Sequence, residues 1–524
     1  MTDWRNACAI PLAGLADLSV WDFQDCVSVG LMKGAQLLAL FGVPARVGGR
    51  QDAVAGGHQD AGASEDPDCV RLFAVLGHPG NGTLEPFSTV VKDSFLSLAP
   101  IHPQVQLFER ELAEKWRVKP QGHPWFKPVR FERPSRDGAD LWEAHPAACG
   151  TADFFRVGGE EVHEVAVGPV HAGIIEPGHF RFQCHGETVY HLEILLGYQH
   201  RGIERALTGG PGPRTLHFME TAAGDTTIGH ATAHCQLAEA VFGLAVPPRG
   251  RVLRGVALEL ERMANHIGDL GALAGDVGFL PTQAFCGRIR GDVLNLTARL
   301  CGNRFGRGLV RPGGVAFDAE PARVREVVRL LEQALADATG AIDLLWESGS
   351  VLARFEGTGP VSAETATRIG LVGPAARACG LSQDVRRDYP CGIWADAPIE
   401  VPTLSTGDVF ARARIRWEEI RVSAEWILAN LADLPDGAVR APDAPPTAAP
   451  WPADTLAVSL TEGWRGRICH AAVTGPDGRF AAYKIVDPSF FNWFGLAQAL
   501  RDQEISDFPL CNKSFNLSYC GFDL

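Results

Sequence analysis

Apolar residues recur at three- and four-residue steps along much of the second half of this 524-residue chain. In the stretch RVREVVRLLEQALADATGAIDLLWE, the positions Val324, Val327, Val328, Leu331 and Leu335 follow this spacing. Because an α-helix repeats every 3.6 residues, such a stripe predicts a helix that packs on one face. The same spacing predicts long helices over 229–243, 252–275, 284–302, 321–353 and 407–432.

The first part of the chain has a different pattern. CVRLFAVLGH is a continuous apolar run that predicts a buried strand, and FSTVVKD and FLSLAP predict further extended segments. Gln104–Trp116 combines an apolar stripe with charges and predicts a helix, followed by a proline-rich arm with little regular structure. Val47–Asp68, rich in Gly, Ala, Asp and Gln, predicts a loop. Together these elements predict a small α/β domain over residues 1–145.

Residues 146–524 are expected to form a second, larger domain, since a chain of this length exceeds what one core usually spans. EEVHEVAVGPVH and HFRFQCHGETVYHLEILLGY predict strands that lead into the long helices. Pro435–Asp454 is rich in Pro and Ala and predicts an exposed insertion without a function. The expected fold class is α+β: the small α/β domain, then a mainly α-helical domain with small flanking antiparallel sheets.

The composition of the chain mainly excludes classes of function. The net charge of -14 argues against a nucleic-acid partner, because such binding needs a basic surface. Thirteen cysteines without framework spacing suit a reducing cytoplasm, and the absence of any C-x-x-C argues against an iron–sulfur cluster or zinc ion held mainly by this chain. No stretch approaches the roughly 20 apolar residues of a membrane span, and no secretory signal is visible. Membrane contact is therefore expected through partner subunits.

Several stretches resemble one protein family, in the right order. HFRFQCHGETVYHLEILLGYQHRGIERAL, GHATAHCQLAEAVFGLAVPPRG and RGVALELERMANHIGDLGALAGDVGF resemble successive segments of the large subunit of energy-converting NiFe hydrogenases and of the quinone-site subunit of respiratory complex I. RPGGV, LVGPAARACGLSQDVRRDYP and DVFARARIRWEEIRVSAEWI are similar to later segments. FERELAEKWRVKPQGHPWFKPVRF resembles the end of complex I's small companion subunit, which formate-hydrogenlyase-type large subunits carry fused at their N-terminus. The resemblance covers nearly the whole chain and implies a companion-like domain followed by a hydrogenase-like domain.

The nickel ligands of that family are missing. A NiFe hydrogenase reads C-G-x-C-x-x-x-H before this helix, and placing His230 on the histidine leaves Ala223 and Thr226 where the cysteines belong. Instead of a terminal D-P-C-x-x-C, the chain has Cys511 and Cys520, nine residues apart. Neither Ala nor Thr can replace a thiolate ligand. The sequence therefore predicts no nickel and no working NiFe hydrogenase, and the two cysteines are expected to be ordinary buried thiols.

The resemblance implies three candidate catalytic residues. His171, in VGPVHAGII, aligns with the histidine that lines the quinone headgroup pocket of complex I, although the tyrosine paired with it there falls on Gly224. Glu204, in RGIE, matches a glutamate that passes protons in hydrogenases, which requires burial to raise its pKa. Asp276, in GDVGF, matches an aspartate near the quinone cavity. The alternatives are a histidine that only packs, a salt bridge between Glu204 and Arg201, and a simple helix-end charge.

Arginines and further histidines complete the candidates. Arg311 and Arg386 are candidate cofactor-binding residues, together with the quinone-pocket histidine. For Arg311, Arg386 and Arg387 the alternatives are that they anchor loops, which is favoured, or face the iron–sulfur partner. His230 and His234 stand one helical turn apart and could share a metal ion, but no third ligand with suitable spacing is apparent. No metal site is predicted.

The predicted function is that of a large subunit in a membrane-associated oxidoreductase related to complex I and hydrogenases, at the cytoplasmic face of the cell membrane. The resemblance implies electrons from a 4Fe–4S cluster in a small partner subunit, a quinone-like acceptor, and membrane-embedded antiporter-like and quinone-channel-like subunits. Two alternatives stay open: a structural subunit that only couples its partners, and a hydrogenase with unconventional ligands.

Overall fold

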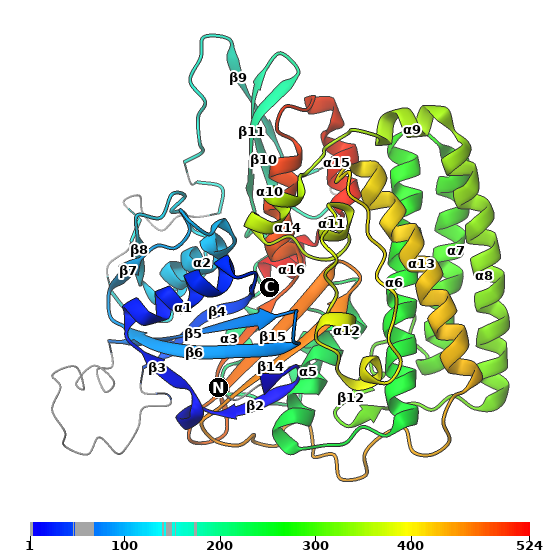
Figure 1. Cartoon of the computed structure of the whole chain (residues 1–524), viewed down its shortest axis with the longest axis horizontal. Coiled ribbons are helices and arrows are strands. Elements are labelled where there is room, and N and C mark those ends of the chain that lie inside the picture. The colour runs from blue at the N-terminus through cyan, green and yellow to red at the C-terminus, as the bar shows by residue number, and fades with distance from the viewer. Residues whose placement is uncertain are drawn as a thin grey trace.

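Two β-sheets and a group of long helices make up most of the fold (Figure 1). The computed structural model describes residues 4–45, 47, 68–138, 141–142, 149–151, 153–171 and 175–524. The predicted loop Val47–Asp68, apart from its two end residues, and the predicted domain boundary near residue 145 lie outside the described residues. Extensive helices and antiparallel sheets occur in the same chain, so the α+β class is confirmed.

The first part of the chain builds one sheet covered by two helices. Its strands run in the order β1-β6-β5-β4, and β3 pairs in parallel with β6. These strands are β1 (Trp4–Arg5), β3 (Ala16–Leu18), β4 (Gln36–Pro44), β5 (Val70–His78) and β6 (Thr83–Val91). Helices α1 (Val20–Met32) and α2 (Gln106–Trp116) lie on one side of the sheet in Figure 1, with the turn η2 (Pro103–Val105) leading into α2. The apolar runs of β4 and β5 are almost entirely buried, which explains their lack of alternation.

A second sheet occupies the centre of the molecule. It contains β2 (Cys8–Pro11), β14 (Thr455–Gly463), β15 (Gly466–Thr474) and β16 (Phe480–Val486), in the order β16-β15-β14-β2. Every residue of β14 and β15 is buried, so this sheet is more enclosed than a flanking sheet. Strand β2 comes from the first 145 residues and pairs antiparallel with β14. The N-terminal part of the chain is thus tied by backbone hydrogen bonds to its C-terminal part.

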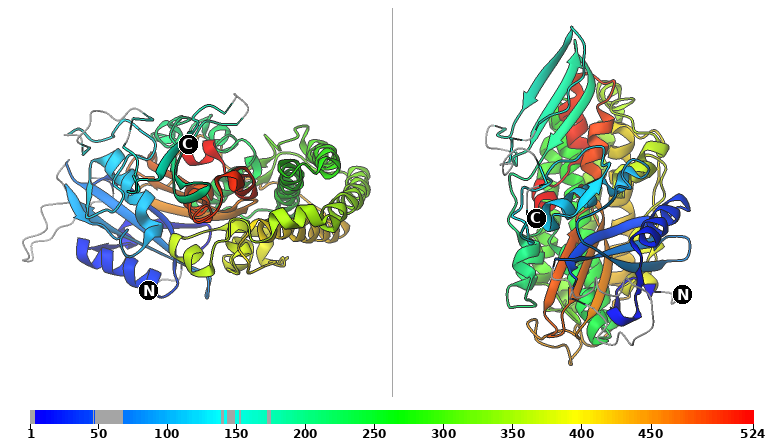
Figure 2. Two further views of the ribbon diagram at one scale, coloured as in Figure 1. Left: turned by 90° about the horizontal axis from the view of Figure 1, so that it is seen from above. Right: turned by 90° about the vertical axis from the view of Figure 1, so that its left-hand side faces the viewer.

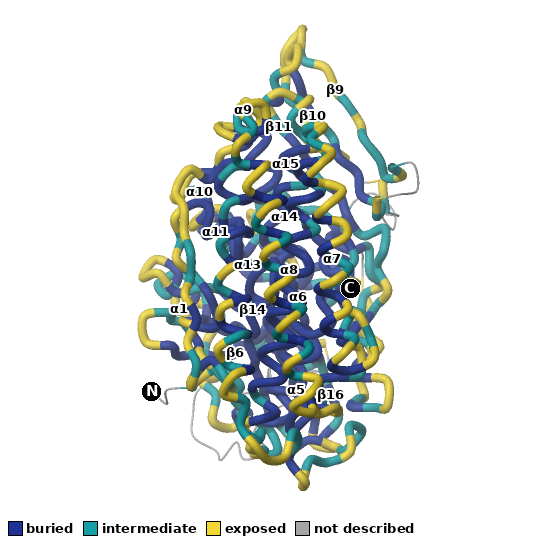
Figure 3. The backbone as a smooth tube through the Cα atoms, turned by 90° about the vertical axis from the view of Figure 1, so that its right-hand side faces the viewer, coloured by how far each residue is buried: buried dark blue, intermediate teal, exposed yellow. Residues whose placement is uncertain are grey.

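Long helices form beside the second sheet, as the periodicity predicted. They are α5 (Thr227–Phe242), α6 (Pro248–Asp276), α7 (Leu280–Cys301), α8 (Pro321–Glu347) and α13 (Val409–Ala432). Helix α5 packs on β14 and β15, and α6, α7, α8 and α13 pack against one another. On α8, Val327 and Leu331 are buried while the outer side of the helix is exposed (Figure 3). The predicted helix 321–353 is interrupted, because Ser348 adopts an extended conformation between α8 and α9 (Gly349–Phe355).

A third sheet stands away from the body at one end of the molecule (Figure 2). Its strands are β9 (Val162–Val167), β10 (His179–His185) and β11 (Thr188–Leu195), in the order β11-β10-β9. Two-stranded pairs are formed by β7 (Ser94–Leu96) with β8 (Lys119–Gln121) and by β12 (Val310–Arg311) with β13 (Gly314–Val315). The proline-rich arm therefore contains a short strand, β8.

Shorter helices connect these layers. They are α3 (Ile203–Leu207), α4 (Thr215–Met219), α10 (Ala363–Ile369), α11 (Gly373–Ala378), α12 (Val385–Asp388), α14 (Ser489–Ala499), α15 (Phe508–Phe515) and α16 (Tyr519–Asp523). Three 3-10 turns are η1 (Leu12–Gly14), η3 (Gly392–Ala395) and η4 (Ile505–Asp507).

The Pro/Ala-rich segment Pro435–Asp454 differs from its prediction. The carbonyl of Val439 accepts a hydrogen bond from the backbone N–H of Val315 at 3.0 Å. Trp451 is only 5% exposed and packs edge-on against Phe480, with ring centroids 4.8 Å apart. The prediction of an exposed insertion is wrong for these residues, because their apolar side chains and backbone close over β13 and the central sheet.

Buried apolar side chains from the whole chain form one continuous core. At the contact between its N-terminal and C-terminal parts, the ring of Phe108 on α2 lies 4.9 Å from that of Phe490 and 5.7 Å from that of Phe491, both on α14. Edge-on aromatic pairs of this kind stabilise a contact beyond the area that they bury. Within the described part of the chain, no helix combines the length and apolar character that crossing a membrane requires.

Candidate functional site

The segment before α5 and the C-terminal end of the chain lie side by side. The guanidinium of Arg201 donates hydrogen bonds to the carbonyls of Thr221 and Ala222, each at 2.7 Å. The same group donates to the carbonyl of Cys520 at 2.8 Å, and the Arg201 backbone N–H donates to Leu524 at 2.8 Å. These are the two segments in which the family resemblance placed the nickel ligands, so the fold assembles both halves of the expected site.

An arginine also joins these two halves. Arg465, in the turn between β14 and β15, donates to both carboxylate oxygens of Asp225, at 2.5 and 2.7 Å. Its Nε donates to the carbonyl of Asn516 at 2.5 Å, and its guanidinium lies 3.9 Å from the ring centroid of Trp464. Two parallel N–H···O bonds fix the carboxylate in direction as well as distance. A cationic side chain thus connects the turn before α5 with the C-terminal segment.

The groups at the expected ligand positions do not fit a nickel ion. Ala223 is fully buried, and the hydroxyl of Thr226 donates to Asp225 at 3.1 Å. Cys511 is buried and Cys520 is partly buried, and burial raises the pKa of Cys511 to about 11, which keeps it a thiol at neutral pH. Among the residues that the structure describes, no three His, Cys, Asp or Glu side chains are grouped as metal ligands. A soft thiolate cage cannot be built from these donors.

The two histidines of α5 belong to a buried chain of hydrogen bonds. His230 contacts Asp487 through Nε2 at 3.1 Å and His470 through Nδ1 at 3.0 Å. The other nitrogen of His470 lies 2.9 Å from the hydroxyl of Tyr483, which lies 3.0 Å from Nδ1 of His234. All five side chains are buried. His230 and His234 therefore have different partners and do not form a metal pair.

One assignment of protons satisfies the whole chain. Burial lowers the pKa of His234 to about 4, and burial and the neighbouring His230 lower the pKa of His470 well below its usual value, so both rings are neutral at pH 7. His234 then donates to Tyr483, which donates to His470, and the direction continues through His230 to Asp487. Burial opposes ionisation of Asp487, but the hydrogen bond from His230 and the nearby Arg465 and Ser489 together outweigh it and lower the pKa. Such a chain can carry a proton towards Asp487.

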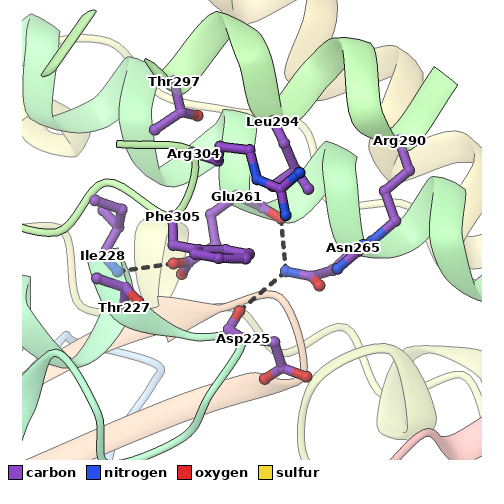
Figure 4. Close-up of a pocket in the computed structure, with 10 residues that line it drawn as sticks. All are labelled: Asp225, Thr227, Ile228, Glu261, Asn265, Arg290, Leu294, Thr297, Arg304 and Phe305. Atoms are coloured by element: carbon purple, nitrogen blue, oxygen red, sulfur yellow. Dashed lines mark hydrogen bonds between the residues drawn. The ribbon is translucent and has the colours of Figure 1, made fainter. Parts of the chain in front are cut away.

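A pocket of about 20 Å³, room for one water molecule, lies beside the N-terminal end of α5 (Figure 4). There the carboxylate of Glu261 accepts hydrogen bonds from the backbone N–H groups of Ile228 at 2.7 Å and Gly229 at 3.1 Å. The amide of Asn265 donates to the carbonyls of Asp225 and Glu261, at 3.0 and 2.9 Å. Burial raises the pKa of Glu261 to about 8, although the two N–H groups oppose this. Glu261 therefore caps α5 and holds a proton at neutral pH.

The loop that contains His171 follows β9 of the third sheet and packs against the C-terminal segment. His171 follows β9, is half-buried, and its Nε2 lies 3.0 Å from the carbonyl of Gly178. A side chain at Gly178 would place its Cβ 2.6 Å from Cε1 of Tyr519, so this loop packs directly on α16. The adjacent positions 172–174 lie outside the described residues. His171 therefore lies in a loop that contacts the C-terminal segment through Gly178.

Glu204 is locked in a buried ion-pair arrangement. Its carboxylate lies 3.1 Å from the Nζ atoms of both Lys115 and Lys484 and accepts the backbone N–H of Ile485 at 3.0 Å. The predicted alternative, a salt bridge with Arg201, is wrong in its partner, because Arg201 binds backbone carbonyls instead. Burial alone would raise the pKa of Glu204, but the two lysines lower it below its usual range. The raised pKa that a proton relay needs is therefore not found.

Asp276 and Arg311 lie at different edges of the helical part. Asp276 is exposed at the C-terminal end of α6. Arg311, in β12, is half-buried and its guanidinium lies 3.3 Å from the carboxylate of Glu220. No contact joins either residue to His171 within the described part of the chain. Their roles at a shared site stay predictions.

Arg386 is fully used inside the protein. It is 2% exposed, and its guanidinium donates to both oxygens of Asp384, at 2.9 and 2.6 Å, and to Glu259 at 2.9 Å. All three guanidinium nitrogens are thus engaged, so the structure supports the anchoring of α12 against α6 for this residue. The neighbouring Arg387 is exposed and pairs with Asp388 at 2.6 Å.

Several site residues had no recognisable local signal. Arg465, His470, Tyr483 and Asp487 lie on or beside the C-terminal strands, where their spacing resembles that of any buried strand. Glu261 was the exception, since a carboxylate within the packed helix RGVALELERMANH indicates a buried acid.

Sequence comparisons agree with this architecture. The family described as "Respiratory-chain NADH dehydrogenase, 49 Kd subunit" matches residues 276–458. The chain is 32% identical over 357 residues to the "Carbon monoxide-induced hydrogenase" of Rhodospirillum rubrum, which covers 68% of this chain and 97% of that protein. It is 27% identical over 447 residues to "Formate hydrogenlyase subunit 5" of Escherichia coli (strain K12), a match that covers 82% of this chain and 77% of that protein. It is 29% identical over 373 residues to "NADH-quinone oxidoreductase subunit 4" of Thermus thermophilus, a match that covers 66% of this chain and 90% of that protein. The chain belongs to the oxidoreductase family that unites these hydrogenase components with the 49-kDa subunit of respiratory NADH dehydrogenase.

Proposed function

We propose that this chain is the large subunit of a membrane-associated oxidoreductase that exchanges electrons with a quinone-like acceptor without NiFe chemistry. The proposed electron source is a 4Fe–4S cluster in a small partner subunit. Antiporter-like and quinone-channel-like membrane subunits are the proposed further partners, at the cytoplasmic face of the cell membrane. Relatives named as hydrogenase components and NADH-quinone oxidoreductase subunits support an oxidoreductase of this type.

The observation that carries this proposal is the bridge between Arg465 and Asp225. By the family resemblance, Ala223 and Thr226 stand at the thiolate positions of NiFe hydrogenases, and the guanidinium of Arg465 binds Asp225 in the turn that contains them. The scaffold of the site is kept while its donors are oxygen and nitrogen. Such donors suit hydrogen bonding to an organic acceptor rather than binding of nickel.

His171 is the proposed partner of the acceptor headgroup. Its Nε2 faces the Gly178 carbonyl at 3.0 Å and donates there, which leaves Nδ1 available. Reduction of a quinone would need two electrons, which the partner's cluster would supply one at a time, and one proton on each carbonyl oxygen. A protonated His171 can give one of these protons from Nδ1 and then accept a hydrogen bond from the resulting hydroxyl.

The N-terminal part is proposed to be a companion-like domain over residues 1–145, fused to the hydrogenase-like domain over 146–524. The match to formate hydrogenlyase subunit 5 covers 82% of the chain, more than residues 146–524 alone could supply. The pairing of β2 with β14 supports a role in holding the larger part of the chain in place.

A purely structural subunit is the second candidate. Two observations favour this candidate. Glu204 forms ion pairs with two lysines, and Gly224 aligns with the tyrosine of complex I that contacts the quinone. A hydrogenase with unconventional ligands is a weaker candidate, since the described residues contain no grouped metal ligands.

The test is quinone-dependent turnover of the assembled complex. His171→Ala is expected to lower turnover by tenfold or more, about 1.4 kcal/mol in the barrier, while assembly measured by size-exclusion chromatography is unchanged. His163→Ala is the matched control, because His163 is an exposed histidine on β9 of the same sheet. Equal turnover in both variants would reject quinone chemistry at this site and support the structural candidate.

A further inference from the structure

A large cavity, separate from the pocket beside α5, lies between the two parts of the chain. It has a volume of about 520 Å³ and is enclosed by α2 and the segment before η2 on one side and by β11 and α14 on the other. Leu107, Leu192 and Trp493 contribute to its mostly apolar wall. This volume falls within the range of about 300–1,000 Å³ typical of small-molecule sites. The cavity can therefore enclose an apolar body of ligand size.

A buried cation that has no ion-pair partner among the described residues lines this cavity. Arg110 is 8% exposed, and its Nε and Nη2 donate to the carbonyls of Lys127 and Pro128, both at 2.8 Å. The nearby acids are engaged elsewhere: Glu193 pairs with Lys127 at 2.6 Å, and Glu114 accepts backbone N–H groups. Burial lowers the pKa of Arg110 to about 10, so the group is still charged at neutral pH. A buried charge of this kind is expensive unless an anion accompanies it.

Two more polar groups line the same wall. The Nε2 atom of His191 is buried and has no hydrogen-bond partner among the described residues. Its ring lies 5.5 Å from that of Trp125 and 4.8 Å from that of Phe155, which holds it in place. Burial and the nearby Arg501 lower the pKa of His191, so it is neutral and can donate from Nε2. Arg501 is exposed at the rim.

We propose that this cavity binds an amphipathic anion, a single carboxylate on an apolar chain, as in a medium-chain fatty acid. The carboxylate would meet Arg110 and the Nε2–H of His191, with Arg501 at the entrance. The chain would lie against Leu107, Leu192 and Trp493. Since Glu193 is neutralised by Lys127, the two arginines give the cavity an excess of positive charge, which selects an anion over a neutral or cationic molecule of the same length.

Calorimetric titration of the purified full-length chain tests this proposal with decanoate as the probe. Decanoate is expected to bind at least tenfold more tightly than decanol and decyltrimethylammonium, and a comparison with decyl phosphate separates a carboxylate preference from a phosphate preference. Equal binding of decanoate and decanol, or no binding of decanoate, would overturn the proposal. Tighter binding of decyl phosphate would overturn the choice of carboxylate.

Substitutions in the cavity wall test whether decanoate binds in this cavity. Ala497→Phe, on the cavity wall, is expected to abolish decanoate binding by filling the space, and Arg501→Gln to weaken it about threefold. Arg329→Gln is the matched control, since Arg329 is exposed on α8, far from the cavity wall in sequence and structure. Arg110→Met is expected to weaken binding at least tenfold; its folding is checked by thermal unfolding because Arg110 also holds two backbone carbonyls. Unchanged affinity in folded Ala497→Phe would place decanoate elsewhere and refute the site.

Discussion

The guanidinium of Arg465 holds the carboxylate of Asp225 through two hydrogen bonds of 2.5 and 2.7 Å. The side chain of Arg465 is 5% exposed and that of Asp225 is 35% exposed, so the pair lies at the edge of the buried interior. Because Arg465 also binds the carbonyl of Asn516, it joins the two segments that supply metal ligands in the resembling hydrogenases. The pair is therefore the structural centre of the candidate site.

Removing this bridge should destabilise the protein. Arg465→Met is expected to lower the free energy of unfolding by about 1–3 kcal/mol, a value below that of a fully buried pair because Asp225 is partly solvated. Chemical denaturation provides the measurement. The control is Arg299→Met, which removes an exposed pair with Glu326 at 2.7 Å and should change stability by less than about 1 kcal/mol. Similar effects of the two substitutions would show that Arg465 does not bridge the site.

The chain should bind no nickel and evolve no hydrogen. Ala223 and Thr226 cannot supply thiolates, and Cys511 and Cys520 do not form a C-x-x-C pair. Elemental analysis of protein made in a nickel-replete host measures this directly, with a hydrogenase large subunit that has both cysteine pairs as the positive control. Stoichiometric nickel in this chain would contradict the prediction.

Glu204→Gln should reduce stability rather than only slow proton transfer. The substitution leaves Lys115 buried without its carboxylate partner, whereas Lys484 keeps its ion pair with Glu111 at 2.5 Å. Breaking the Lys115 pair is therefore expected to cost about 3 kcal/mol, the low end for a broken buried pair. Because the folded-state pKa of Glu204 is lowered, its stabilising effect is present above the ordinary glutamate pKa of 4.5 and is lost as the pH falls below it. Thermal unfolding at pH 7 tests this, with Glu425→Gln on the exposed side of α13 as control. A variant as stable as the control but slow in proton-coupled turnover would restore the relay role.

Glu261 should make stability depend on pH in the opposite direction. Its pKa is raised to about 8 in the folded state, against an ordinary value of 4.5, so the folded protein retains a proton that the unfolded chain releases. Stability contributed by this group is complete below about pH 4.5 and is lost as the pH rises to about 8, by about 1.4 kcal/mol per pH unit at most. Denaturation curves at pH 6, 7 and 8 should show wild type losing stability relative to Glu261→Gln. Parallel pH profiles would mean that Glu261 is already ionised at pH 6.

The sequence alone determined the helical framework, and the prediction that the family's thiolates are missing rests on it as well. The repeat of apolar residues that predicts α5 to α8 and α13 is a local feature of the sequence, because the residues of one helical stripe are only three or four positions apart. The apolar run of β5 is local in the same way. The prediction that Ala223 and Thr226 stand at the ligand positions likewise rests on the sequence, with His230 setting the alignment.

Only the tertiary structure decided which contacts hold the turn before α5. Asp225 and Arg465 are 240 positions apart in the sequence, and His230 and Asp487 are 257 apart. Neither pair has a spacing that predicts contact, because each depends on how α5 packs against the central sheet and on the turn between β14 and β15. The same holds for Glu204, whose lysine partners come from α2 and β16, and whose pKa falls because these cations outweigh its burial. Long-range packing sets the charge of such groups, and a local pattern of residue types contains no information on it.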